Sequence, residues 1–229
     1  MRHLGCLKKG LVLSEKNTIF SDRMSRVKSQ QSLDAKVFRR LVRRGSGSVA
    51  TPSDFLDLGS RAGVDQALSR LVRQGALRRV SRGVYNYPEK NRLLGELSPG
   101  PEKVAKALAR QGLQRIIPSG AYAANLLGLS EQVPARVEYL TDGPSRKVMI
   151  CKLPVILKRT TPRQMATASR VSGSVAQALR FLRKDQVDET IIKKLRTRLS
   201  KEDKEQLLKD IPLVPAWIGE IFRQVAETA

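Results

Sequence analysis

The sequence predicts an α+β protein with two domains, and three observations lead to this fold class. Two short helical patterns at a tight turn precede a basic hairpin within residues 51–88. Pro-Gly-Pro punctuation at 99–101 is typical of a domain boundary. Three strand-like runs then precede a long helical region. We expect an N-terminal domain over 31–90, a linker over 91–101, and a C-terminal domain over 102–229 with a small antiparallel sheet and several helices.

Residues 1–30 are polar, basic and without periodicity, and we expect them to be a disordered tail. Their only apolar patch is short, so we expect no signal peptide. From Ser32 onward, an apolar stripe between Ala35 and Val42 predicts a helix that ends in the loop at Gly45. The arginines around this stripe either contact a DNA backbone or form a solvated face, and the sequence leaves both alternatives open.

The next helix is predicted to start at Thr51, because a hydroxyl side chain is a good N-cap. Pro52 suits the first helical position, and Asp54 places negative charge at the positive end of the helix. Gly59 ends this helix, and Ser60 caps the one that follows. Two helices joined this closely are typical of a helix-turn-helix.

In the helix after Ser60, apolar residues recur at three- and four-residue spacing and predict a buried face: Val64, Ala67, Leu68, Leu71 and Val72. Gly75 ends this helix. The strand-like runs Leu77–Val80 and Val84–Tyr87 then flank a turn, and Pro88 ends the second run. The pattern predicts a winged helix-turn-helix, with this hairpin as the wing.

The exposed face of the second helix has the polar groups that read base edges in a DNA major groove. The candidate DNA-binding residues on this face are Ser60, Arg61, Gln66, Ser69 and Arg70. On the hairpin, Arg78, Arg79 and Arg82 suit phosphates or a minor groove, where charge and position matter most. We expect double-stranded operator DNA as the partner. The alternatives are an ordinary solvated helix face and a protein-docking winged helix.

The composition favours a polyanionic partner. The 229 residues include 43 Lys and Arg against 21 Asp and Glu, which gives a formal net charge of +22. Aromatic residues make up only 4% of the chain, which disfavours recognition by base stacking. No apolar run approaches a membrane span, and the cysteines, Cys6 and Cys151, lie far apart. We expect a cytoplasmic protein with no membrane partner.

In the C-terminal domain, Glu102–Arg110 predicts a helix and Gln114–Ile117 a strand. Ser119 is predicted to cap a helix that ends at Gly128. The small antiparallel sheet is assigned to the runs Ala135–Leu140, Arg146–Cys151 and Pro154–Arg159. From Pro162 onward we expect helices, with breaks near Ser172, Lys184, Ser200 and Pro212.

The sequence argues against an enzyme. The only histidine is His3, in the predicted tail, so a serine–histidine–aspartate triad and a histidine metal cluster are excluded. Glu138 and Asp142 are candidate magnesium ligands of a nuclease, but Ile150 stands where such a site needs a carboxylate near Lys152. We expect no catalytic residue, metal or cofactor. A nucleic-acid-binding or processing protein that acts on RNA or single-stranded DNA remains the alternative.

Together with residues 51–88, the segments Pro118–Gly143, Arg159–Arg180 and Leu207–Ile218 resemble the antitoxin of AbiE-type, type IV toxin–antitoxin systems of bacteria. The resemblance runs from about Leu33 to the end of the chain. It implies a winged helix-turn-helix that represses its own operon by binding inverted repeats in the promoter. It also implies a C-terminal domain that counters a nucleotidyltransferase-like toxin, without necessarily forming a stable complex.

The resemblance places DNA reading on Arg61, Gln66 and Arg70, and the wing contacts on Arg78, Arg79 and Arg82. The candidate antitoxin surface is Arg159, Arg163 and Arg170, with ordinary solvated arginines as the alternative. No coiled-coil seam is present, so we expect a monomer or weak dimer that pairs on DNA.

Overall fold

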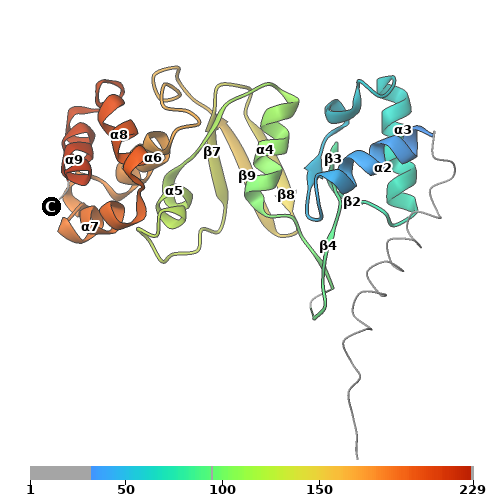
Figure 1. The fold of residues 1–229 in the computed structure, drawn as a ribbon, viewed down its shortest axis with the longest axis horizontal. Coiled ribbons are helices and arrows are strands. Elements are labelled where there is room, and N and C mark those ends of the chain that lie inside the picture. The colour runs from blue at the N-terminus through green and yellow to red at the C-terminus, as the bar shows by residue number, and fades with distance from the viewer. Residues whose placement is uncertain (1–31, 94, 228–229) are drawn as a thin grey trace, which may run out of the picture. The chain divides into compact units, whose positions relative to one another are not determined.

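The computed structural model of the chain describes residues 32–93 and 95–227 and has an α+β fold (Figure 1). It divides into two compact units, of which the N-terminal unit ends at Leu97 and the C-terminal unit begins at Ser98. This division falls inside the expected linker, 91–101. The expected tail over residues 1–30 lies outside the described residues.

The N-terminal unit combines helices with a three-stranded sheet. Its elements are α2 (Leu33–Arg43), β1 (Val49–Ala50), the 3-10 helix η1 (Pro52–Phe55), α3 (Arg61–Arg73), β2 (Arg78–Ser81) and β3 (Val84–Asn86). The strand order is β1-β3-β2, and both pairings are antiparallel. The predicted helix after Ser60 and the hairpin that follows it are thus present.

A core of buried apolar side chains holds α2, η1 and α3 together. Phe38 from α2, Phe55 from η1 and Leu68 from α3 are all 1% exposed or less. The Phe38 ring lies edge-on to the ring of Tyr87 at a centroid distance of 5.7 Å. Of the five apolar positions predicted for α3, Val64, Ala67, Leu68 and Leu71 are buried and Val72 is partly buried.

The helix predicted from Thr51 to Gly59 is shorter than expected. Only Pro52–Phe55 are helical, and they form a 3-10 helix. The Asp54 carboxylate accepts hydrogen bonds from the Thr51 backbone N–H at 2.7 Å and from its hydroxyl at 3.1 Å. The Asp54 and Leu58 N–H groups donate to carbonyls three residues back, at 3.0 and 2.9 Å, and this spacing defines the tighter helix.

A second hairpin, β4 (Glu89–Asn91) and β5 (Gly95–Leu97), occupies most of the expected linker. All three residues of β4 are exposed. The linker prediction therefore located the boundary but not this ordered hairpin, because short polar strands have no apolar alternation to reveal them.

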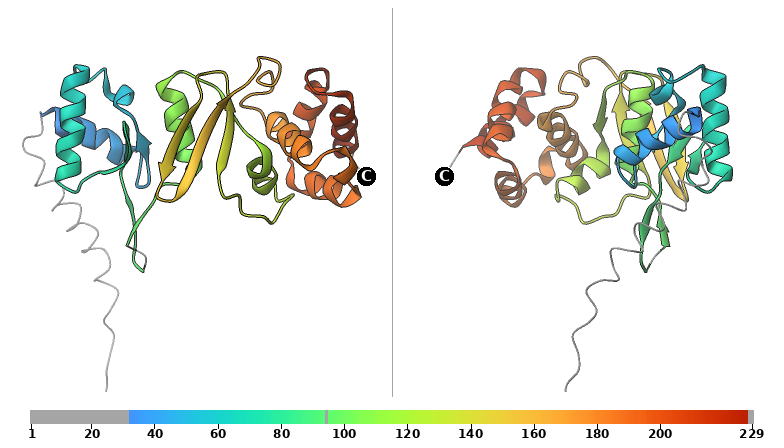
Figure 2. Two further views of the ribbon diagram at one scale, coloured as in Figure 1. Left: turned by 180° about the vertical axis from the view of Figure 1, so that it is seen from behind. Right: turned by 45° about the vertical axis from the view of Figure 1, so that its right-hand side comes forward.

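The C-terminal unit is a mixed sheet with helices. Its elements are α4 (Pro101–Gln111), β6 (Ile116–Pro118), α5 (Gly120–Leu126), β7 (Val137–Thr141), β8 (Arg146–Ile150), β9 (Leu153–Arg159), α6 (Val171–Leu182), the 3-10 helices η2 (Lys184–Gln186) and η3 (Ile211–Leu213), α7 (Glu189–Arg198), α8 (Lys201–Lys209) and α9 (Ala216–Ala226). In Figure 2, α6 to α9 gather on one side of this sheet. None of the helices within 32–93 and 95–227 is long and apolar enough to cross a membrane.

The sequence predicted a purely antiparallel sheet in the C-terminal unit, but the sheet is mixed. Its order is β6-β7-β9-β8, with β7 and β9 parallel and the outer pairs antiparallel. From β8 the chain turns back at Cys151 and Lys152, and β9 inserts between β7 and β8. Val155 and Leu157 of β9 are at most 1% exposed. The apolar pattern of the sequence predicted the positions of the strands. It did not predict their order in the sheet, in which the buried strand β9 lies in the middle.

The helices α5 to α9 enclose a second apolar core that includes Val175, Leu195 and Phe222. Gly173 in the first turn of α6 has no room for a side chain, because an added Cβ would lie 2.4 Å from the Thr167 carbonyl oxygen. The helix break predicted near Ser200 is confirmed, since Ser200 and Asp203 form a capping box at the start of α8.

Candidate nucleic-acid interface

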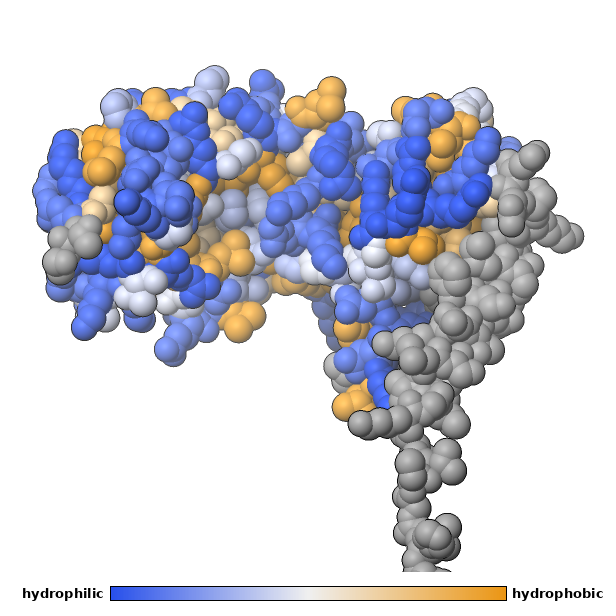
Figure 3. Space-filling model, in the orientation of Figure 1, coloured by the Kyte–Doolittle hydropathy of each residue, from blue (hydrophilic) through white to orange (hydrophobic). Residues whose placement is uncertain are grey.

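The helix α3 is fixed on one face and exposed on the other. At its start, the Ser60 hydroxyl accepts a hydrogen bond from the Gly63 N–H at 3.2 Å. The buried side chains of Val64, Ala67, Leu68 and Leu71 pack into the core of the unit. This packing leaves Arg61, Gln66 and Ser69 exposed, as the periodicity predicts. Hydrophilic side chains cover much of the face of this unit that is visible in Figure 3.

The exposed face of α3 is open for contacts. Gln66 and Ser69 line a shallow hollow of about 400 Å³ with Asp65, Arg70 and Arg73. The side chains of Gln66 and Ser69 make no hydrogen bond with another described residue. Arg61 forms an ion pair with Asp65 at 3.0 Å, and both side chains are about half exposed. Such a surface pair contributes little and is easily exchanged for a ligand.

Arg70 is bound to another helix, which the sequence did not suggest, although its side chain stays 42% exposed. Its Nε and Nη2 donate to the two carboxylate oxygens of Asp34 in α2, each at 2.7 Å. This hydrogen bonding raises the pKa of Arg70. The pair joins α3 to α2. Because Asp34 lies far away in sequence, local periodicity carried no signal of this contact.

The hairpin of β2 and β3 presents arginines to solvent. It turns at Arg82 and Gly83, where Gly83 has a φ of +70°, a conformation that favours glycine. Arg78, Arg79 and Arg82 are exposed. Arg79 and Arg82 make no side-chain hydrogen bond or ion pair with any other residue that the structure describes. Their charges are therefore available to an anionic partner.

The α2 arginines serve the fold in a way that neither alternative from the sequence foresaw. Arg40 donates to both carboxylate oxygens of Asp57 at 2.6 Å and to the Asp54 carbonyl at 2.8 Å. Arg44 forms an ion pair with Asp54 at 3.2 Å, and both guanidinium groups lie 5.9 Å from the centre of the Phe55 ring. The hydrogen bond from Arg40 holds the pKa of Asp57 below its usual range. These contacts clamp η1 onto α2.

In the C-terminal unit, Arg159, Arg163 and Arg170 are all exposed. Arg170 has a structural contact, because its Nη1 donates to the buried Asp210 carboxylate at 2.5 Å. Arg163 lies near Arg180, whose pKa is lowered by burial and then by the charge of Arg163. The candidate antitoxin surface thus combines two solvent-facing arginines with one that is bound to Asp210.

The candidate magnesium ligands are both engaged with arginines. Glu138 pairs with Arg136, and Asp142 pairs with Arg115, each at 2.8 Å. The hydrogen bond from Arg115 lowers the pKa of Asp142. No group of three potential metal ligands occurs in the described part of the chain. Ser119 occupies the N-cap of α5 as predicted, but its side chain makes no capping hydrogen bond.

Comparisons with known proteins give one family and one structural relative of note. Residues 36–207 match DUF6088, which is described as a family of unknown function. The crystal structure of the Rv2827c protein from Mycobacterium tuberculosis is similar with a TM-score of 0.42 and 16% sequence identity, over 86% of this chain and 82% of that one. A search of curated proteins finds no match.

Proposed function

We propose that this chain, which belongs to the DUF6088 family of unknown function, is a DNA-binding autorepressor whose N-terminal unit is a winged helix-turn-helix. Two features of this unit together support the proposal. The helix α3 is capped at its start and exposes Arg61, Gln66 and Ser69. The hairpin that follows it carries Arg79 and Arg82, which have no partner among the described residues. The net charge of +22 supports a polyanionic partner.

In this proposal α3 enters the major groove. Gln66 has the amide geometry that pairs with the N6 and N7 edge of adenine. Arg61 exchanges its exposed pair with Asp65 for a base edge or a phosphate. Arg70 is a positioning residue, since its guanidinium is paired with Asp34 and sets the angle between α2 and α3. The hairpin arginines neutralise phosphates and supply affinity rather than specificity.

The resemblance to AbiE-type antitoxins supports a second role for the C-terminal unit. We propose that this unit counters a nucleotidyltransferase-like toxin encoded beside it, with Arg159 and Arg163 as the exposed part of the active surface. The protein would act in the cytoplasm, as a monomer or weak dimer that pairs on an inverted repeat. Co-expression of the full chain with the neighbouring gene product tests this role, and failure of rescue would contradict it.

Replacing both Arg79 and Arg82 with glutamine is expected to weaken binding to operator and scrambled duplexes by the same factor. Because each lost phosphate contact lowers the salt slope by about 0.9, the slope of log K against log salt concentration should fall by about 2. Band shifts at several salt concentrations measure both effects. The matched control removes the same charge from two exposed lysines of α8, Lys201→Gln with Lys209→Gln. Equal losses in control and hairpin variants would reject the wing assignment.

Replacing Gln66 with alanine is expected to weaken the free energy of binding to the operator by about 1–3 kcal/mol, through one base pair, and to leave binding to scrambled DNA unchanged. The reason is that Gln66 lies on the exposed face of α3 and no other described residue binds its amide. Competition band shifts with single-base operator variants locate the affected pair. A loss of the same size on every duplex, or tighter binding to RNA or single strands than to the operator, would contradict major-groove reading.

A further inference from the structure

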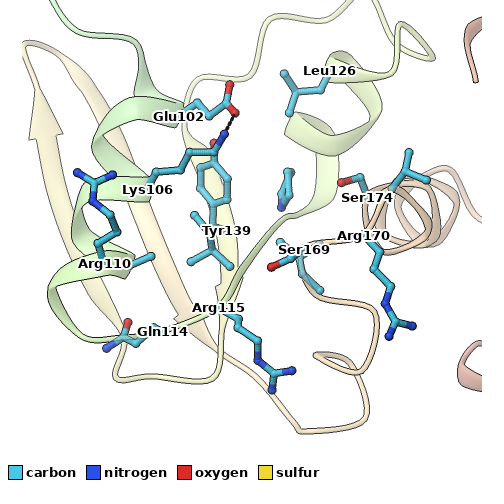
Figure 4. Close-up of a pocket in the computed structure, with 15 residues that line it drawn as sticks. Glu102, Lys106, Arg110, Gln114, Arg115, Leu126, Tyr139, Ser169, Arg170 and Ser174 are labelled. Carbon is cyan, nitrogen blue, oxygen red and sulfur yellow. Dashed lines mark ion pairs between the residues drawn. The ribbon is translucent and has the colours of Figure 1, made fainter. Parts of the chain in front are cut away.

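The C-terminal unit contains a cavity that the proposed DNA contacts do not use. Its volume is about 780 Å³, which lies within the range of small-molecule sites. It is lined by residues of α4, α5, β6 and β7, by the loop before β6, and by the residues that begin α6 (Figure 4). It lies entirely within one compact unit, so its shape does not depend on how the two units are placed.

The charged side chains of this cavity are mostly basic. The lining includes four cationic residues and one carboxylate: Lys106, Arg110, Arg115, Arg170 and Glu102. Arg115 binds Asp142 through Nε, and Arg170 binds Asp210 through Nη1. The remaining guanidinium N–H groups of these two arginines make no hydrogen bond with a described residue. Both side chains extend toward the lower part of the view in Figure 4.

The cavity wall contains a buried tyrosine hydroxyl. Tyr139 is only 2% exposed, and its hydroxyl makes no hydrogen bond of ordinary geometry with a described residue, although the Tyr122 side chain lies beside it. Its ring extends toward the ion pair of Lys106 and Glu102, in which the two charged groups are 2.6 Å apart (Figure 4). An unsatisfied buried hydroxyl costs about 1–3 kcal/mol. Burial, and after it the neighbouring Tyr122 side chain, raises the pKa of Tyr139, so the hydroxyl keeps its proton and can donate to an anion.

The opposite wall is the start of α6, a helix of 12 residues. Ser169, Val171 and Ser174 line the cavity there, so the positive end of the helix and two hydroxyls face it. Apart from Gln114, the rest of the wall is apolar and suits a ring: Ala109, Ile116, Ile117, Pro118 and Leu126.

We propose that this cavity binds a phosphate-bearing small molecule of the nucleoside polyphosphate class. The phosphates lie against Lys106, Arg115 and the first turn of α6, and Tyr139 donates to one of their oxygens. The base and sugar occupy the apolar part, which a bare phosphate leaves unfilled. This site is independent of the DNA contacts of the N-terminal unit.

The test uses the full chain, with ATP, pyrophosphate and adenosine as probes in calorimetric titrations. ATP is expected to bind most tightly, pyrophosphate more weakly, and adenosine more weakly still. Tyr139→Phe should weaken ATP binding about tenfold, the factor that corresponds to about 1.4 kcal/mol for one hydrogen bond. It should leave the unfolding temperature of the free protein unchanged or higher, since it removes only an unsatisfied group.

A second pair of variants separates the cavity from the general basic surface. Lys106→Gln is expected to weaken ATP binding, whereas Lys103→Gln removes the same charge from an exposed residue of α4 outside the cavity and should leave binding unchanged. Absence of ATP binding would overturn the proposal. So would adenosine binding as tightly as ATP, or equal ATP affinity in the wild type, Tyr139→Phe and Lys106→Gln proteins. If Tyr139→Phe does not fold, the comparison of Lys106→Gln with Lys103→Gln tests the proposal.

Discussion

Replacing Phe38 with alanine is expected to destabilise the N-terminal unit by about 3–5 kcal/mol and to abolish DNA binding near physiological temperature. The side chain is 1% exposed, packs in the core shared by α2 and α3, and contacts the Tyr87 ring edge-on. Its loss leaves a cavity under the helix that we propose to read DNA. Far-UV circular dichroism during heating measures the loss of helix in this unit.

The chain offers an internal reporter for this experiment. The only tryptophan, Trp217, lies in α9 and packs against the core of the C-terminal unit. Its fluorescence therefore follows that unit alone, and its unfolding temperature should stay unchanged in Phe38→Ala. Leu56→Ala is the matched control, because Leu56 is 48% exposed in the same unit and should cost less than about 0.5 kcal/mol. An equal fall in the Trp217 transition would mean that the two units unfold together.

Replacing Asp210 with alanine is expected to destabilise the C-terminal unit by about 2–4 kcal/mol. The carboxylate is 1% exposed and accepts hydrogen bonds from Arg170 and from the buried hydroxyl of Ser172. It thereby ties the first turn of α6 to the end of α8. Without it the Ser172 hydroxyl is buried and unpaired, whereas the half-exposed Arg170 turns to water, which limits the loss.

The Trp217 fluorescence transition measures this change directly. Asp185→Ala is the matched control, because it removes the same charge from an exposed residue of η2. Asp210→Asn keeps the shape and one acceptor and should fall between the wild type and Asp210→Ala. If Asp210→Ala and Asp185→Ala unfold at the same temperature, the bridge between α6 and α8 contributes nothing to stability.

Local patterns in the sequence predicted most of the secondary structure. The apolar residues that begin with Val64 predicted α3 and its buried face, and Ser60 predicted its start. Both predictions succeeded because the spacing of apolar residues and the capping residue are properties of neighbouring positions in the chain. The exposure of Gln66, Arg79 and Arg82 followed from the same patterns. The DNA-reading and antitoxin roles stay proposals.

Contacts between distant segments were not predictable in this way. Arg70 looked like any exposed arginine of a helix until α2 brought Asp34 to it, and Arg40 and Arg44 looked solvated until η1 supplied their carboxylates. The order of β7, β9 and β8 likewise depends on which strand is buried in the middle of the sheet.

The amino-acid sequence by itself determined the position of most helices and strands, the division into two units and the strong positive charge, since these depend on composition and on residues close along the chain. Only the tertiary structure decided which arginines are available to a partner and which form ion pairs with carboxylates of the same unit. It also brought Tyr139, Lys106 and the start of α6 around one cavity. The physical reason is that pairing and burial depend on distances in space, which the spacing along the chain does not encode.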